Sequence, residues 1–172
     1  MLTRSVFHLF TGIPTVSSKK NVIKKIKEDS FFENVFDKNK TLYDFGCGYG
    51  GVLYEVSKKY GCRGRGYEIN PSVVFVSHIL SFFYPKDIRK KVRIFLGNMY
   101  KVNLEKADIV FLFLLPNTVK KLEKKIKEEC KSGTFVICNT FKFEKIEPIY
   151  EIKSEKKLES IYVYEIKKSA SI

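Results

Sequence analysis

The feature that most constrains the fold of this chain is a short apolar segment, residues 41–45, that runs directly into a glycine cluster of sequence GCGYGG at residues 46–51. A stretch with helical periodicity follows over residues 52–60 and stops at Gly61. Closely spaced glycines let the backbone turn sharply and let a ligand lie against bare main chain. The N-terminus of a helix behind such a turn attracts an anionic group. The pattern therefore predicts a strand, a ligand-binding turn and a helix, in preference to a plain tight turn.

The rest of the chain repeats this alternation of strand and helix. Alternating units predict a mostly parallel sheet with helices on both faces, which is an α/β Rossmann-like doubly wound fold. Further strands are expected over residues 64–69, 92–96, 108–114 and 134–140, and further helices over residues 19–28, 70–84 and 116–130.

The last part of the chain has a different pattern. Residues 148–152 and 160–166 alternate apolar and polar side chains on either side of the polar stretch 153–159, which is typical of an antiparallel hairpin. A length of 172 residues with 44% apolar content favours one domain. We expect a Rossmann-like core over residues 19–172, preceded by an N-terminal lid segment over residues 1–18.

The glycine cluster allows two ligands. Gly46, Gly48 and Gly51 satisfy the G-x-G-x-x-G pattern of dinucleotide-binding proteins. Asp44, however, precedes the first glycine by two residues, where a carboxylate would repel a pyrophosphate but suits the cationic amino and sulfonium groups of S-adenosylmethionine. Gly50 completes the pattern D-x-G-x-G-x-G, and a chain of 172 residues leaves no room for the second domain that dehydrogenases carry. We therefore expect S-adenosylmethionine as the cofactor.

Two further strand ends carry polar side chains that suit an adenosine. Glu68 lies 20 residues after Gly48, where a carboxylate can accept both ribose hydroxyls, although a lone acid there would also suit a helix cap. Asn98 can bond the adenine edge while Met99 packs on its face, although Asn98 alone also suits a turn. The predicted cofactor-binding residues are Asp44, Phe45, Gly46, Cys47, Gly48, Gly50, Glu68, Ile69, Asn98, Met99 and Leu114.

On these residues the chain resembles class I S-adenosylmethionine-dependent methyltransferases over residues 21–166. More narrowly, it is similar to small archaeal protein-lysine methyltransferases and to related mitochondrial enzymes that methylate lysines of the ATP synthase c-subunit and the adenine nucleotide carrier. The segments that carry this narrower resemblance are PTVSS at residues 14–18, EIN at 68–70, GNM at 97–99, VNL at 102–104 and FLLPN at 113–117.

The resemblance implies transfer of a methyl group to the side-chain amine of protein lysines. It places residues 14–18 in front of the first helix as part of the acceptor channel, with two serines where the family has a proline and a threonine. We expect residues 12–18 to lie over the methyl end of the cofactor as a lid. The predicted channel residues are Thr15, Val16, Ser17, Ser18, Leu115, Pro116 and Asn117.

The predicted end of the fourth strand favours an amine acceptor. It lacks the N-P-P-Y pattern of enzymes that methylate adenine or glutamine amides, and neither Cys130 nor Cys138 has the context of a cytosine methyltransferase nucleophile. Both are expected in the core. A lysine amine needs only desolvation, which lowers its pKa, and alignment with the methyl group. His8 and His78 have no evident acidic partner, so we assign no catalytic residue.

Composition limits the remaining possibilities. The net charge is +13, from 32 Lys and Arg against 19 Asp and Glu, which favours acidic proteins or RNA as partners. The alternatives to a lysine methyltransferase are an RNA or small-molecule methyltransferase and a non-enzymatic scaffold. The charge supports RNA, but no stacked aromatic platform for RNA bases is evident in the sequence. The four cysteines form no C-x-x-C pair, so no metal is expected. We also expect no membrane span, no signal peptide, a cytoplasmic location and a monomer.

Overall fold

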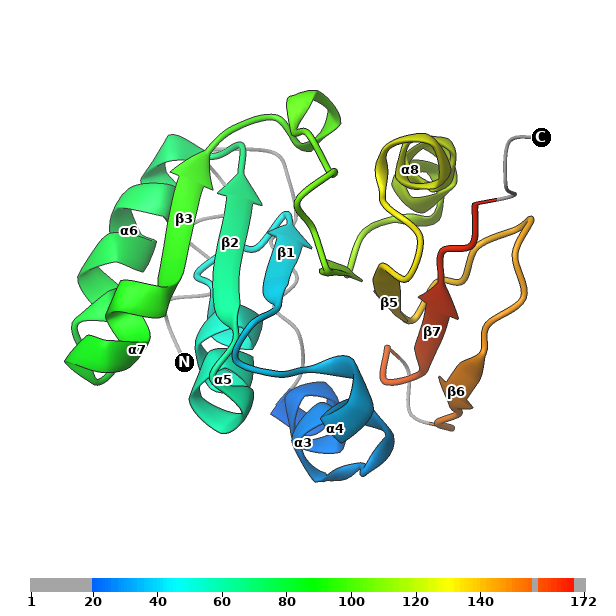
Figure 1. Cartoon of the computed structure of the whole chain (residues 1–172). Helices are drawn as coiled ribbons and strands as arrows, with labels where there is room; N and C mark the ends of the chain where they lie inside the picture. The colour runs from blue at the N-terminus through cyan, green and yellow to red at the C-terminus, as the bar shows by residue number, and fades with distance from the viewer. Residues whose placement is uncertain (1–19, 156–157, 169–172) are drawn as a thin grey trace.

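The computed structural model describes residues 20–155 and 158–168, and these build one seven-stranded sheet in the order β3-β2-β1-β4-β5-β7-β6 (Figure 1). Strands β1 to β5 are parallel, whereas β7 runs antiparallel to β5 and β6 runs antiparallel to β7. The strands are β1 (Thr41–Phe45), β2 (Arg63–Glu68), β3 (Val92–Leu96), β4 (Ile109–Leu112), β5 (Phe135–Asn139), β6 (Tyr150–Ile152) and β7 (Ile161–Glu165).

The helices divide between the two faces of the sheet. Helices α3 to α7 contribute buried side chains to one apolar cluster, and α8 contributes to a second cluster on the opposite face. Within the described residues, no helix is both long enough and apolar enough to cross a membrane. The helices are α3 (Lys20–Glu28), α4 (Phe31–Val35), α5 (Gly51–Tyr60), α6 (Pro71–Ser81), α7 (Lys86–Lys91), the 3₁₀ turn η1 (Met99–Lys101) and α8 (Pro116–Glu129).

The doubly wound α/β fold and the C-terminal antiparallel pair are confirmed. The helix predicted over residues 70–84 is present but three residues too long, because α6 ends at Ser81, and the short helix α7 that begins after Pro85 was not predicted. The strand predicted over residues 108–114 is too long, since β4 ends at Leu112. That residue pairs with Phe45, the last residue of β1, so the chain beyond it has no β1 neighbour to pair with.

Cover on the second face is incomplete. Helix α8 packs there against β1, β4 and β5 through Val119, Leu122 and Ile126. Between β3 and β4, where another crossover helix would cover β2 and β3, the chain forms only the three residues of η1. Consequently β2 alternates between exposed and buried side chains along its first four residues, while all five residues of β1 are buried.

The packing of α5 against β2 depends on Gly66. A Cβ atom added there would lie 2.5 Å from the Cys47 sulfur and 2.8 Å from a methyl carbon of Leu53. Real Cβ atoms do not tolerate such distances, so a side chain at this position would push the loop and helix α5 away from the strand. At Gly51, the first residue of α5, a Cβ atom would extend into open space.

We predict that Gly66→Ala lowers the free energy of unfolding by about 1–3 kcal/mol, through overpacking. Gly51→Ala is the matched control, and we expect it to be neutral or slightly stabilising, because alanine favours a helix more than glycine does. Thermal unfolding should show a drop of roughly 2–4 °C per kcal/mol for the Gly66 variant. Equal melting temperatures for the two variants would contradict this account.

Candidate functional site

The candidate site lies at the carboxyl edge of the parallel strands. The arrows of β1, β2 and β3 point toward the same edge in Figure 1, so the segments that follow them meet there. Ligands of open α/β sheets bind in the crevice at this edge. The sequence motifs identified after each strand therefore lie on neighbouring elements.

The glycine turn between β1 and α5 has a conformation that side chains rarely adopt. Gly46 and Gly50 have φ values of 69° and 80°, in the left-handed region. A Cβ at Gly50 would also lie 2.6 Å from Ile94, and one at Gly46 would lie 3.0 Å from Leu114. The turn is closed by the Gly50 N–H, which donates to the carbonyl of Cys47 at 2.9 Å. Leu114 and Ile94 thus pack closely against the main chain of this turn, and its glycines carry no side chain that would keep a ligand away from it.

The structure places Glu68 directly against this turn. Its Oε2 accepts a hydrogen bond from the Gly48 N–H at 3.1 Å. Its Oε1 accepts from the N–H groups of Ile69 and Asn70 at 2.9 and 3.0 Å. Three backbone donors therefore fix the carboxylate between the end of β2 and the glycine turn, where it can accept hydrogen bonds from a diol.

Asp44 is the buried acid of the site. It is 4% exposed at the end of β1, and its carboxylate accepts no hydrogen bond from the part of the chain that the structure describes. Burial, and secondly the negative charge of Glu68, raise the pKa of Asp44 to about 8. A nearby cation would relieve both costs, whereas a pyrophosphate would add to them. The pair fits a ligand that carries positive charge, such as the ammonium and sulfonium groups of S-adenosylmethionine.

The end of β3 contributes Asn98 and Met99. The Asn98 Oδ1 accepts a hydrogen bond from the Tyr100 N–H at 3.0 Å and so begins η1. Met99 is partly buried and packs against the second apolar cluster. A cleft of about 730 Å³ opens beside them, lined by Tyr43, Tyr67, Leu96, Gly97, Asn98, Lys101, Val102, Asn103, Glu105 and Lys106.

The remaining predicted site residues differ in what they can contact. The side chain of Phe45 is fully buried in the core, so only its backbone can face a ligand. Leu115 is 64% exposed and precedes Pro116, the first residue of α8. Leu114 lies against Gly46, and Asn117 is exposed in the first turn of α8. The channel residues Thr15, Val16, Ser17 and Ser18 fall outside the residues that the structure describes.

The cysteines and the described histidine offer no nucleophile or base. Burial raises the pKa of the Cys47 thiol, and the carboxylates of Asp44 and Glu68 raise it further. Cys130 and Cys138 are fully buried, as expected. His78 contacts the backbone carbonyl of Ile94 at 3.3 Å, with no carboxylate partner among the described residues. No group of three metal-ligating side chains occurs in the described ranges either.

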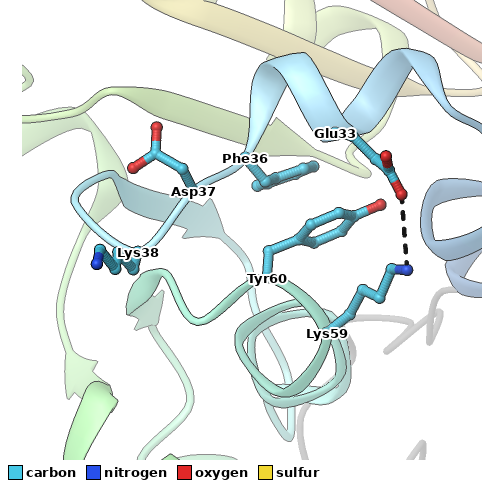
Figure 2. Close-up of a pocket in the computed structure, with 6 residues that line it drawn as sticks. All are labelled: Glu33, Phe36, Asp37, Lys38, Lys59 and Tyr60. Carbon is cyan, nitrogen blue, oxygen red and sulfur yellow. Dashed lines mark ion pairs between the residues drawn. The ribbon is translucent and has the colours of Figure 1, made fainter.

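A second pocket lies at the other end of β1 and is not the candidate site. Figure 2 shows its lining residues, which come from α4, the segment after it and the end of α5. The rings of Phe36 and Tyr60 stack with centroids 5.0 Å apart, and Lys59 pairs with Glu33 at 3.8 Å. The Tyr60 hydroxyl already donates to the carbonyl of Ile26 at 2.7 Å, so its proton is not available to a ligand.

A doubly wound sheet with a glycine turn after β1 and acids at the ends of β1 and β2 defines a Rossmann-like methyltransferase. The chain belongs to the ANTKMT methyltransferase domain family, whose model matches residues 44–150. The match begins at Asp44 and spans the glycine turn and the ends of β2, β3 and β4.

Individual relatives agree with the family. The chain is 26% identical to a protein-lysine N-methyltransferase from Saccharolobus islandicus, over 83% of this chain and 86% of that one. It is 26% identical to the ATP synthase C-subunit lysine N-methyltransferase of Xenopus laevis over 75% of this chain, but it spans only about half, 52%, of that relative. An RNA methyltransferase from Salinibacter ruber, solved with S-adenosyl-L-homocysteine, superposes with a TM-score of 0.80 at 25% identity, over 91% and 97% of the two chains. The predicted resemblance is confirmed.

The raised pKa of Asp44 predicts a pH-dependent stability. In the unfolded chain Asp44 loses its proton above its ordinary pKa of 3.8, whereas in the folded chain it keeps the proton up to about pH 8. The free energy of unfolding therefore falls as the pH rises from about 4 to about 8. Asp44→Asn removes this effect. Its stability advantage over the wild type should therefore grow, by an amount of the order of a few kcal/mol, between about pH 5 and about pH 8.

Denaturant unfolding of both proteins at the two pH values measures this difference. Asp87→Asn, at an exposed acid of α7, controls for the loss of one negative charge in a strongly positive protein. A constant difference between wild type and the Asp44 variant across the pH range would show that Asp44 ionises normally.

Proposed function

We propose that this chain transfers the methyl group of S-adenosylmethionine to the side-chain amine of lysines in proteins. The observation that carries the proposal is the similarity to the Saccharolobus islandicus protein-lysine N-methyltransferase over 83% of this chain. The geometry at the carboxyl edge agrees with that activity, both for the cofactor and for the acceptor. Proteins with exposed lysines would then be its partners.

Five of the predicted cofactor residues have a specific part in this proposal. Glu68 accepts the ribose hydroxyls, and Asp44 offsets the cationic amino group beneath the glycine turn. Asn98 and Met99 bind the adenine by its edge and its face, and Leu114 packs beside Gly46 under the methionine part. When bound, the cofactor supplies an electrophilic methyl group on a sulfonium.

The acceptor side of the site is apolar. Residues 113–117, from the end of β4 into the first turn of α8, have the sequence FLLPN, in which no side chain titrates. Leu115 and Pro116 are exposed there, so they can desolvate an aliphatic amine and lower its pKa toward the neutral, nucleophilic form. An amine that sheds its proton to water needs no protein base, and alignment supplies the remaining rate enhancement. Residues 12–18 would complete the channel as a lid.

RNA is the second candidate acceptor. The observation that favours it is the likeness to the Salinibacter ruber RNA methyltransferase over 91% of this chain. The net charge of +13 suits RNA as well as acidic proteins. Incubation with tritiated S-adenosylmethionine, followed by separation of protein from RNA, distinguishes the two acceptors.

The cofactor assignment predicts that Glu68→Ala weakens S-adenosylmethionine binding by at least about tenfold, because two charge-assisted hydrogen bonds to the ribose are lost. Titration calorimetry measures the affinity. Glu28→Ala, at an exposed acid of α3, removes the same charge away from the site and should bind as the wild type does. Unchanged affinity in the Glu68 variant would reject the proposed binding mode.

The acceptor assignment predicts that mass spectrometry finds added methyl groups on lysines of proteins incubated with the enzyme and cofactor. Leu115→Asp should lower kcat/KM for the protein acceptor by about tenfold or more, because a carboxylate at the channel mouth stabilises the unreactive ammonium form. Cofactor affinity should stay unchanged in this variant. Methyl groups found on RNA and on no protein would replace the lysine proposal with the RNA one.

A further inference from the structure

The exposed sheet face beside the site carries a row of cationic and aromatic side chains. We define the open face as Arg63, Arg65 and Tyr67 of β2 together with Arg93 and Phe95 of β3. We propose that the open face binds single-stranded nucleic acid, with its phosphates on the arginines and its bases on the rings. This binding function is separate from methyl transfer and does not depend on which acceptor the enzyme uses.

The described residues leave this face of β2 and β3 uncovered, which is unusual for parallel strands. Parallel sheets occur almost always with both faces covered. Here β1, β2 and β3 are parallel, and the connection from β3 to β4 forms only η1 on the side that α8 leaves open. Arg63, Arg65 and Arg93 are exposed as a result. A partner is therefore the simplest explanation for the side chains that this face presents.

Two positive charges on the open face lie side by side on neighbouring strands. Arg65 lies directly opposite Arg93 in the register of β2 and β3. Like charges at opposed positions destabilise a sheet, and neither arginine forms an ion pair with a carboxylate of the described residues. Only five of the 32 basic residues in the chain are arginines, and three of those five lie on this face. Guanidinium groups bind phosphates in a bidentate geometry that lysine does not match.

The rings continue the row toward the carboxyl edge. Tyr67 lies opposite Phe95, and their rings stack with centroids 5.5 Å apart and planes inclined by 24°. Tyr43 of β1 extends the series, with its centroid 5.7 Å from that of Tyr67. Both Tyr67 and Phe95 are only partly buried, so ring surface remains available to solvent. Aromatic rings that a sheet leaves accessible to solvent are the surfaces on which proteins stack unpaired bases.

The cleft of about 730 Å³ lies at the end of this row. Tyr43 and Tyr67 form part of its lining, and Lys101 and Lys106 add two further positive charges. Glu105 is the one carboxylate among its lining residues. The cleft also reaches Asn98, so a strand bound on the open face would continue toward the cofactor edge of the sheet.

Two other occupants fit the open face less well. A second copy of this chain would bring its own arginines and a further +13 of charge to the contact. An acidic protein segment would match the arginines but would leave the accessible surface of Tyr67 and Phe95 without a planar group to stack on. Unpaired bases joined by phosphates match both kinds of side chain.

The test is fluorescence anisotropy with labelled oligouridylate of about 12 nucleotides as the probe, measured between about 50 and about 200 mM salt. We expect Arg65→Ser with Arg93→Ser to weaken binding at least about tenfold and to reduce the slope of log affinity against log salt by about 1.4, which is two single-strand phosphate contacts. Phe95→Leu keeps the apolar bulk and should weaken binding about five- to tenfold through lost stacking.

The matched control is Lys58→Ser with Lys86→Ser, which removes the same charge from exposed positions of α5 and α7 on the opposite side of the sheet. This control should retain wild-type affinity. Equal losses in the two double variants would mean diffuse attraction to a positive protein and would overturn the proposal. Competition by polyglutamate as strong as that by oligouridylate, with no effect of Phe95→Leu, would assign the face to acidic proteins instead. Circular dichroism confirms that each variant is folded.

Discussion

The site depends on one close contact, that of the turn after β1 with strand β2. Gly66 lets the Cys47 sulfur and helix α5 pack directly onto the strand, because no side chain separates them. The same contact brings the Gly48 N–H within 3.1 Å of the Glu68 carboxylate. Strand β1 is buried along its whole length between β2 and β4, which fixes Asp44 in the same place. The geometry of the candidate site thus follows from backbone packing more than from any single polar bond.

Burial and charge then act together at this contact. Asp44 would have an ordinary pKa if it were well exposed or hydrogen-bonded. It is only 4% exposed and accepts no hydrogen bond from the described residues, and Glu68 adds a second negative charge. The ligand-free site is therefore held at an electrostatic cost. A cationic ligand recovers that cost on binding, which gives the site a preference for positively charged cofactors without any direct recognition of the sulfonium.

Much of this arrangement could be predicted from the sequence, because local patterns determine it. The limits of β1 and β3 follow from apolar runs, and the antiparallel tail follows from alternation. The break after Ser81 was not predicted, since three apolar residues continue the helical pattern beyond it and remain exposed or half-exposed. The neighbouring rings on the sheet face were also not evident from the sequence. Tyr43, Tyr67 and Phe95 are far apart in the chain, and only the register of three parallel strands makes their rings neighbours.

The reactivity of the four cysteines can report local opening motions of this protein. All four thiols are free and buried, and they lie in different parts of the fold: the glycine turn, the start of β2, the end of α8 and strand β5. Burial raises the pKa of Cys62 to about 11 and that of Cys130 to about 12, so the folded chain presents little thiolate to solvent. Alkylation of each thiol then requires a local opening of the fold, and the alkylation rate measures how often that region opens. A comparison of Cys47 with Cys138 would separate fluctuations of the cofactor turn from opening of the central sheet.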